Sequence, residues 1–217
     1  MIVYTAIIED YDTLLEPRVR EDGIRYVCIT DRAPPETKGW EILLTGRTEA
    51  DPRLQQRSYK ILSHRAFPEA ELTLYIDGNF ELLVDPRDLA ARYLEDSDIA
   101  LFRHPQRDGI FAELEACAAL GKDDPDTLAA VAAKYRAEGL PEVGFLFAGG
   151  LILRRHSPAI ASFNEAWYEE LRQSTYRDQP PLGYTLWRTG VTPATIDKNI
   201  WHNDLFNFYA HKHKRTG

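Results

Sequence analysis

The sequence predicts an α/β fold built as one domain. Short apolar runs rich in β-branched residues alternate with longer segments that start at helix-capping signals, which is typical of a mixed, mostly parallel sheet flanked by helices. The chain has 217 residues, of which 44% are apolar, enough for one sizeable core. No repeat, low-complexity segment or linker divides the chain, so we expect a single domain over residues 1–217.

The expected elements follow from two local signals. Apolar runs of four to nine residues predict strands, and an Asp-Pro or Ser-Pro pair predicts a helix start, because the Asp or Ser oxygen accepts the N–H groups that the first turn leaves unpaired. A further helix is expected between the fifth strand and Asp124. The expected strands are residues 2–8, 24–30, 40–44, 72–76, 99–102 and 145–153, and the helix starts are Asp51, Asp85, Asp124 and Ser157.

Composition and charge exclude several classes of protein. The net charge of −8 argues against a nucleic-acid binder or a binder of anionic membrane surfaces. Cys28 and Cys117 are too few and too far apart for a disulfide framework or a metal motif. No apolar run approaches the roughly 20 residues needed to cross a bilayer, and no signal peptide precedes the first strand, so we expect no transmembrane segment and a cytoplasmic protein.

The centre of the predicted sheet is the strand Leu72–Ile76, which leads directly into Asp77-Gly78-Asn79. An acid next to a core strand is costly unless it is solvated or bound. A hairpin turn is one interpretation, since Asp-Gly is a hairpin dipeptide. The other is a ligand site, because ligands bind at the carboxyl ends of strands in open α/β sheets. If residues 77–81 stay extended, Glu81 shares a face with Asp77. Polar groups also follow the other strands, at Thr5 to Tyr11, Thr30-Asp31 and Arg103-His104.

Several spaced motifs then occur in one order along most of the chain: Gln56–Leu62, His64–Pro68, Tyr75–Asn79, His104–Arg107 with Glu113, Gly149–His156, Phe163-Asn164 with Trp167, and Arg177–Gln179. Together they resemble the glycosyltransferase-like domain family of plants and bacteria, whose plant members are associated with seed mucilage and with tapetal and guard-cell turgor. The resemblance implies a GT-A-like fold. In GT-A nucleotide-sugar transferases, a basic residue on a helix, an Asp-x-Asp strand end and a downstream Asp-Gln serve one donor site.

The resemblance also implies a metal. A departing diphosphate needs its charge neutralised by a divalent ion or by Lys and Arg. Asp77 and Asn79 take the place of Asp-x-Asp, and Asn79 offers a weaker, neutral ligand for Mn²⁺ or Mg²⁺. A C-terminal His is a further ligand in related transferases. His211 is our candidate, His202 and His213 are alternatives, and an exposed tail histidine is the other interpretation.

Basic residues are expected to contact the donor. Arg57 and Lys60 lie three apart on one helix, so they share a face that can meet a phosphate or a sugar hydroxyl; a solvated helix face is the alternative. His104 and Arg107 leave a strand near a helix start, where anions bind. Glu113 on that helix is either paired with Arg107 or His104, or catalytic.

The carboxylate of Asp178 and the amide of Gln179 can hold two hydroxyls of a sugar and orient its anomeric carbon. A helix cap is the alternative for Asp178. Tyr11 can stack on a uracil or sugar ring. The remaining donor contacts expected at strand ends are Thr5, Asp31 and Arg154.

Three classes of function are therefore expected. The first is a glycosyltransferase that moves a sugar from a nucleotide-sugar donor, such as a UDP-sugar, to a saccharide or other small acceptor with help from Mn²⁺ or Mg²⁺. The second is a degenerate transferase that binds a nucleotide sugar without turnover, for which Asn79 is the main argument. The third is a hydrolase of a polar lipid or sugar bond using Asp77, His104 and Glu113.

Overall fold

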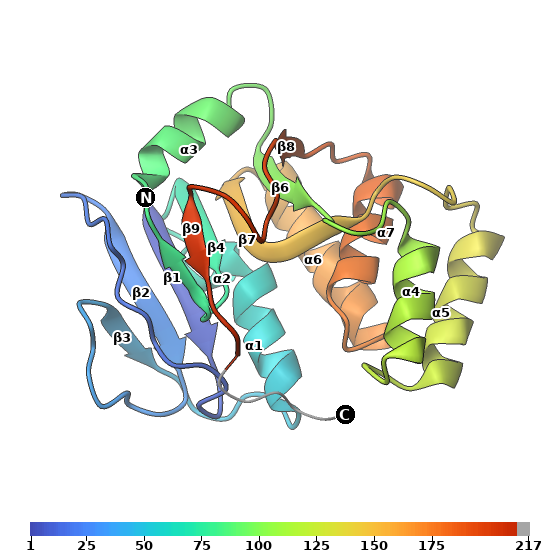
Figure 1. The fold of residues 1–217 in the computed structure, drawn as a ribbon, viewed down its shortest axis with the longest axis horizontal. Helices are drawn as coiled ribbons and strands as arrows, with labels where there is room; N and C mark the ends of the chain where they lie inside the picture. The colour runs from blue at the N-terminus through green and yellow to red at the C-terminus, as the bar shows by residue number, and fades with distance from the viewer. Residues whose placement is uncertain (212–217) are drawn as a thin grey trace.

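The computed structural model describes residues 1–211, which form a mixed seven-stranded sheet with helices packed against it (Figure 1). The order in the sheet is β3-β2-β1-β4-β7-β6-β8, and within these residues β7 is antiparallel to both of its neighbours while the other pairings are parallel. The mostly parallel α/β prediction is therefore confirmed. The strands are β1 (Ile2–Ile7), β2 (Arg25–Thr30), β3 (Glu41–Leu44), β4 (Leu72–Ile76), β6 (Ile99–Arg103), β7 (Phe147–Arg155) and β8 (Ala194–Ile196), and β5 (Phe80–Leu82) pairs with β9 (Phe206–Phe208) apart from the main sheet.

The four predicted helix starts are confirmed. Asp51, Asp85, Asp124 and Ser157 each accept a backbone N–H with their side chain, and a Pro follows each of them. The sequence did not predict the short helix α2. The helices are α1 (Pro52–Ile61), α2 (Ser63–Ala66), α3 (Pro86–Tyr93), α4 (Ile110–Ala119), α5 (Pro125–Ala137), α6 (Pro158–Gln173) and α7 (Gln179–Thr189).

Alternation along the central strands sends side chains into two core layers. Val3 and Leu74 pack with residues of α3, β5 and β9 on one face of the sheet. Tyr4 and Tyr75 pack with residues of α1, α6 and α7 on the other. A third cluster joins α4 and α5 to Tyr184 of α7. The packing of these layers therefore places α1 and α7 next to the carboxyl ends of the central strands β1 and β4.

The segment after β4 is a turn, but not the turn of a β4 hairpin. Phe80 N–H donates to Asp77 O at 3.0 Å, and the next strand, β5, pairs with β9 rather than with β4. Residues 77–81 therefore do not stay extended. Glu81 is turned away from Asp77 and bonds instead with Arg18 and Asn207.

Strand direction decides which end of β7 meets the other strand ends. Because β7 is antiparallel, its first residues lie beside the carboxyl end of β4, and Asp77 N–H donates to Gly150 O at 2.8 Å. The strand begins at Phe147 and extends to Arg155, two residues later at each end than predicted. None of the helices within residues 1–211 is long and apolar enough to cross a membrane. Both cysteines are free and buried.

Candidate active site

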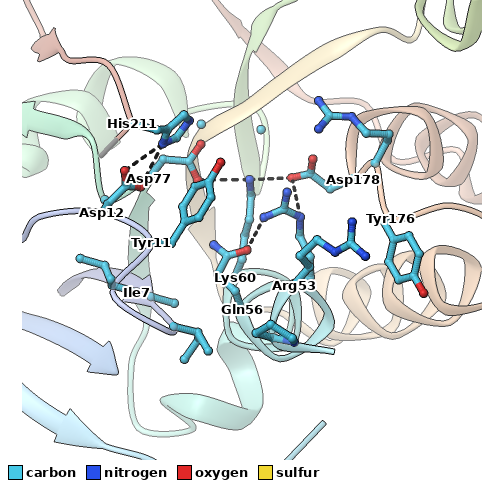
Figure 2. Close-up of a pocket in the computed structure, with 18 of the residues that line it drawn as sticks. Ile7, Tyr11, Asp12, Arg53, Gln56, Lys60, Asp77, Tyr176, Asp178 and His211 are labelled. Atoms are coloured by element: carbon cyan, nitrogen blue, oxygen red, sulfur yellow. Dashed lines mark hydrogen bonds and ion pairs between the residues drawn. The ribbon is translucent and has the colours of Figure 1, made fainter. Parts of the chain in front are cut away.

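A cleft of about 530 Å³ opens at the carboxyl ends of β1 and β4, between α1, the loop after α4 and the loop before α7. Figure 2 shows His211, Asp12 and Tyr11 at one end of it, with Arg53 and Tyr176 at the other end. Five cations and three carboxylates of the described residues line the cleft: Arg53, Arg57, Lys60, Lys122 and Arg177, with Asp12, Asp77 and Asp178.

Lys60 and Asp178 form a buried ion pair between these two ends (Figure 2). Lys60 Nζ lies 2.6 Å from Asp178 Oδ2, and the two side chains are 2% and 7% exposed. Arg57 Nε lies 3.5 Å from the same oxygen. Burial alone would raise the pKa of Asp178, but the charges of Arg57 and Lys60 outweigh it and hold that pKa well below its usual range. Asp178 is therefore an ionised carboxylate inside the protein.

The position of Asp178 at the start of α7 does not make it a helix cap. Its side chain accepts no capping hydrogen bond from α7, and its backbone is in the α region rather than the extended region usual for an N-cap. Instead, its carbonyl accepts the indole N–H of Trp167 at 3.1 Å. The helix-cap interpretation is therefore wrong, and the carboxylate is free to serve the cleft. Gln179, the next residue, also lines the cleft.

Asp77 lies at the end of β4 and joins the same charge network. Lys60 Nζ is 3.4 Å from its Oδ1, and the hydroxyl of Tyr75 donates to that oxygen at 2.7 Å. Burial, with the charge of Asp77 second, raises the pKa of Tyr75 well above its usual value, so the phenol keeps its proton and its hydrogen bond. The Asp77 side chain remains 27% exposed. One acid thus faces the cleft beside the buried pair.

Gly149 and Gly150 let the backbone of β7 approach this network. A Cβ on Gly149 would lie 3.2 Å from both Lys60 Nζ and Asp178 Oδ2. A Cβ on Gly150 would lie 2.6 Å from a ring carbon of Phe80. The sequence indicated a close backbone approach at this Gly-Gly pair, and the structure identifies the groups that come close.

Arg154 has a different place from the one expected for a donor contact. It is fully buried and does not line the cleft. Its guanidinium donates to Lys60 O at 2.7 Å, to Ile61 O at 2.8 Å and to the hydroxyl of Tyr4 at 2.7 Å. Arg154 therefore holds the C-terminal end of α1, whose carbonyls have no partner within the helix, and so positions Lys60 rather than a ligand.

The other end of the cleft is formed by the residues that follow β1 and by the C-terminal segment. His211 Nδ1 donates to Asp12 at 2.9 Å, and the ring of Tyr11 lies 5.1 Å from the imidazole, centroid to centroid. The hydrogen bond from His211 to Asp12 raises the pKa of His211, and the charges of Asp12 and Asp77 add to this. Ile7 and Ile8 give this end an apolar wall.

Thr5 and Asp31 do not line the cleft. Thr5 lies inside β1 and is buried, paired in register with Cys28. Asp31 follows β2 and accepts the backbone N–H of Glu9 at 2.8 Å, so it fixes the loop after β1. Neither residue is placed to touch a ligand directly in this arrangement.

The residues expected to hold a metal are only partly together. Asp77 and His211 line the cleft, whereas Asn79 does not. The Asn79 amide donates to Tyr209 O at 2.7 Å, and its Oδ1 is buried and has no partner among the described residues. Within residues 1–211 no three His, Cys, Asp or Glu side chains are grouped to share an ion. His202 is exposed and lies outside the cleft, and His213 lies outside the described residues. The described residues therefore bring two of the expected ligands, Asp77 and His211, to the cleft, fewer than the six or so that Mg²⁺ needs.

His104, Arg107 and Glu113 form a separate cluster beside the cleft. Arg107 NH1 donates to Glu113 Oε2 at 2.8 Å, His104 Nε2 is 3.6 Å from the same oxygen, and the thiol of Cys117 donates to Glu113 Oε1 at 3.2 Å. None of these four lines the cleft. Burial lowers the pKa of His104, and Arg107 contributes to the shift while Glu113 opposes it. Of the two interpretations of Glu113, the structure shows the paired one.

Several lining residues carry a signal that the sequence analysis did not use. Arg53 and Gln56 stand at helical spacing with Arg57 and Lys60, at positions i, i+3, i+4 and i+7, so α1 presents one polar stripe. Asp12, Lys122, Tyr176 and Arg177 come from loops. No periodic pattern marks loop residues, and only the fold brings them to the cleft.

The sequence was compared with protein families and with characterised proteins, and it is similar to one family and to two plant proteins. Residues 38–213 match the family described as "TOD1/MUCI70, glycosyltransferase-like domain". The chain is 30% identical to the probable hexosyltransferase MUCI70 of Arabidopsis thaliana over 81% of its own length, and 24% identical to the alkaline ceramidase TOD1 of the same plant over 95%. It spans 30% and 52% of the lengths of these two relatives.

A solved structure with a similar fold is the apo form of mouse xyloside xylosyltransferase 1. The two chains superpose with a TM-score of 0.50 and 11% sequence identity, over 86% of this chain and 81% of the mouse chain. At that identity the likeness concerns the fold alone. It confirms the GT-A-like arrangement expected for the sheet.

Proposed function

Since this chain belongs to the TOD1/MUCI70 glycosyltransferase-like domain family, we propose that it is a glycosyltransferase whose donor is a nucleotide sugar, a UDP-sugar in the simplest case. The observation that carries the proposal is the buried charge network of Lys60, Arg57, Asp178 and Asp77. It faces a cleft large enough for a small ligand at the sheet edge where α/β proteins bind ligands.

The shape and charge of the cleft support one orientation of the donor. The nucleoside lies at the end with the apolar wall of Ile7 and Ile8 and the ring of Tyr11. The diphosphate then lies over Lys60 and Arg57, which neutralise the charge that develops as the nucleoside diphosphate leaves. Gly149 and Gly150 of β7 line the cleft beside the network and place no side chain over it, so the sugar is assigned to this part of the cleft.

Asp178 and Gln179 then orient the sugar. Because the pKa of Asp178 is held well below its usual range, its carboxylate is a weak base and a permanent hydrogen-bond acceptor. We therefore assign it to accepting sugar hydroxyls rather than to removing a proton. The side-chain amide of Gln179 can both donate to and accept from a neighbouring hydroxyl, so the two residues fix the position of the anomeric carbon.

If Mn²⁺ or Mg²⁺ assists, Asp77 and His211 would hold the ion, and the donor phosphates would supply further oxygen ligands. The ion would supply positive charge at the departing diphosphate. His211 bonds Asp12 through Nδ1, which leaves Nε2 for a ligand and gives the imidazole a carboxylate partner, as metal-binding histidines have. Asn79 is turned to Tyr209 and is left out of this set.

Calorimetric titration with UDP, GDP and ADP, each with Mn²⁺ and with a chelator, tests the nucleotide site. A panel of nucleotide sugars assayed for release of the nucleoside diphosphate then tests turnover. We expect millimolar or tighter binding of at least one nucleotide and loss of that binding in Lys60→Met. Arg172→Gln, on the exposed side of α6, is the matched control and should bind as the wild type does.

Two outcomes would contradict the transferase. Nucleotide-sugar binding without turnover in any acceptor mixture would make the protein a binding protein, the degenerate alternative. Hydrolysis of an amide-linked lipid without nucleotide binding would make it a hydrolase. Among the described residues no Ser or Cys lines the cleft, so such a hydrolase would have no side-chain hydroxyl or thiol of that kind as its nucleophile.

A further inference from the structure

The end of the cleft opposite the nucleoside end has its own chemistry, and we infer that it binds an acceptor saccharide carrying an anionic group such as a carboxylate or a phosphate. This acceptor subsite is formed by Arg53, Lys122, Tyr176 and Arg177. The inference rests on the proposed function, because it takes the cleft to be the site of sugar transfer, and it names the class of the acceptor.

The first observation is unbalanced positive charge. Arg53 is paired with Asp51 at 2.9 Å, but Lys122 and Arg177 form no ion pair within the part of the chain that the structure describes. The Nε of Arg177 is buried and has no hydrogen-bond partner among residues 1–211. Leaving a buried charged donor unpaired costs about 1–3 kcal/mol or more, and because Arg177 lines the cleft, its guanidinium can be stabilised by an acceptor group of a ligand.

The imbalance is local and runs against the charge of the whole protein. The chain has a net charge of −8, yet cations outnumber carboxylates along the cleft. Asp178 is flanked first by Lys60 and Arg57, and the charge of Arg177 contributes less to its low pKa than theirs do, so Asp178 neutralises the subsite only in part. A neutral acceptor could form hydrogen bonds here, whereas an anionic one is also attracted by the excess positive charge.

The second observation is that the subsite is held in place before any ligand binds. Asp123, next to Lys122, accepts the backbone N–H of Tyr176 at 2.9 Å and the hydroxyl of Thr175. Thr175 Oγ1 in turn accepts the backbone N–H of Arg177 at 3.1 Å. The loop after α4 and the loop before α7 are thus tied together. The backbone that carries Lys122 and Arg177 is therefore preorganised, which lowers the cost of ordering the subsite on binding.

The third observation is an aromatic surface suited to a sugar ring. Tyr176 is 39% exposed, and the guanidinium carbon of Arg53 lies 4.1 Å from its ring centroid. This cation–π contact holds Arg53 against the ring. Leu120, which lines the same side of the cleft, is also exposed. Exposed apolar groups next to cations fit a ligand with one apolar face and one charged substituent.

The position of the subsite assigns it to the acceptor rather than to the donor. Figure 2 shows Arg53 and Tyr176 on the far side of Asp178 from Tyr11, Asp12 and His211. A donor that places its nucleoside against Tyr11 and its sugar at Asp178 reaches only to the middle of the cleft. The molecule beyond Asp178 is the one that receives the sugar.

Matched pairs of saccharides test the inference by NMR titration or calorimetry, with saturating UDP and without it. The pairs are methyl glucuronide with methyl glucoside, methyl galacturonide with methyl galactoside, and glucose 6-phosphate with glucose. We expect the charged member of at least one pair to bind about tenfold more tightly, the value of one charge-assisted hydrogen bond. The carboxylate and phosphate pairs distinguish the two kinds of anion.

Lys122→Gln and Arg177→Gln should each remove most of this preference while UDP binding stays as in the wild type. Lys198→Gln, which removes a lysine outside the cleft, should preserve it. Equal affinity for both members of every pair would overturn the inference while leaving the proposed function standing if UDP still binds. A preference for UDP-glucuronate over UDP-glucose that depends on Lys122 would also overturn it, because the anion would then belong to the donor.

Discussion

The Lys60 and Asp178 pair allows a prediction about stability that a surface pair would not. We consider Lys60→Met, which keeps an unbranched side chain of similar length, Asp178→Asn, which keeps the shape of the carboxylate, and the double variant. Each single change leaves one charge of the pair inside the protein, at side chains that are 2% and 7% exposed. Removing one partner of a buried pair costs about 3–5 kcal/mol, whereas an exposed pair contributes about 0–1 kcal/mol.

The neighbouring charges place the expected value at the lower end of that range. Asp178 keeps Arg57 at 3.5 Å in Lys60→Met, and Lys60 keeps Asp77 at 3.4 Å in Asp178→Asn. We therefore expect each single variant to lose about 3 kcal/mol. Because the double variant leaves no unpaired member of the pair, it should lose about 3 kcal/mol or less rather than the sum of about 6 kcal/mol, a coupling of about 3 kcal/mol.

Urea titration and scanning calorimetry of the wild type and the three variants give this coupling. For a chain of this size about 3 kcal/mol corresponds to roughly 6–12 °C in Tm. Arg92→Gln with Asp197→Asn is the control cycle, since that pair is 57% and 65% exposed and should couple by less than about 1 kcal/mol. Additive costs near 1 kcal/mol for Lys60 and Asp178 would refute the buried pair and fit a helix cap instead.

Three further predictions concern groups around the cleft. The hydrogen bond to Asp12 raises the pKa of His211, so this pair stabilises the fold fully below the ordinary histidine pKa of about 6.5. The stabilisation is lost as the pH rises through the higher pKa of the folded state. Asp12→Asn should flatten that part of the pH profile of the unfolding free energy, and an unchanged profile would count against the pair. Gly150→Ala places a methyl 2.6 Å from a ring carbon of Phe80 and should lower the free energy of unfolding, measured by urea titration, by about 1–3 kcal/mol. The control is Gly46→Ala, whose methyl would have nothing within 4 Å and should leave the urea midpoint unchanged. An unchanged midpoint in Gly150→Ala would contradict the close contact with Phe80. In calorimetry, Mn²⁺ should increase the affinity for UDP, and UDP should increase the affinity for Mn²⁺ by the same factor. Asp77→Ala should abolish this coupling. Equal UDP affinity of the wild type with Mn²⁺ and with a chelator would remove the metal from the proposal.

The parts of the fold that the sequence predicts are those with local causes. The four predicted helix starts are examples. Each capping side chain accepts an N–H group two or three residues away, so a few neighbouring residues determine each start: Asp51, Asp85, Asp124 and Ser157. The pairing of β5 with β9 joins residues about 126 positions apart through strands of three residues. Nothing in either short run indicates its partner, because that choice is made by packing, as in the stacking of Phe80 on Phe206.

The candidate site divides in the same way. Arg57, Lys60, Asp77 and Asp178 come together as the sequence motifs indicated. Arg154 does not, because the expectation assumed that every strand end faces the same edge of the sheet. β7 runs the other way, with Arg154 opposite Thr73 at the beginning of β4. The direction of a strand depends on its neighbours in the sheet, and a single sequence does not state it.

The antiparallel strand β7 and the helix α6 help to keep two opposite charges inside the protein with their side chains at the cleft. A buried ion pair adds little stability compared with apolar side chains of the same size, so its presence points to a use of the charges themselves. The backbone of each residue is fixed from behind: Arg154 of β7 donates to Lys60 O at 2.7 Å, and Trp167 of α6 donates to Asp178 O at 3.1 Å. The main chain that carries each charge is therefore held in place by a buried hydrogen bond. A ligand that enters the cleft meets a cation and a carboxylate already in position, so the cost of ordering them is part of folding rather than of binding.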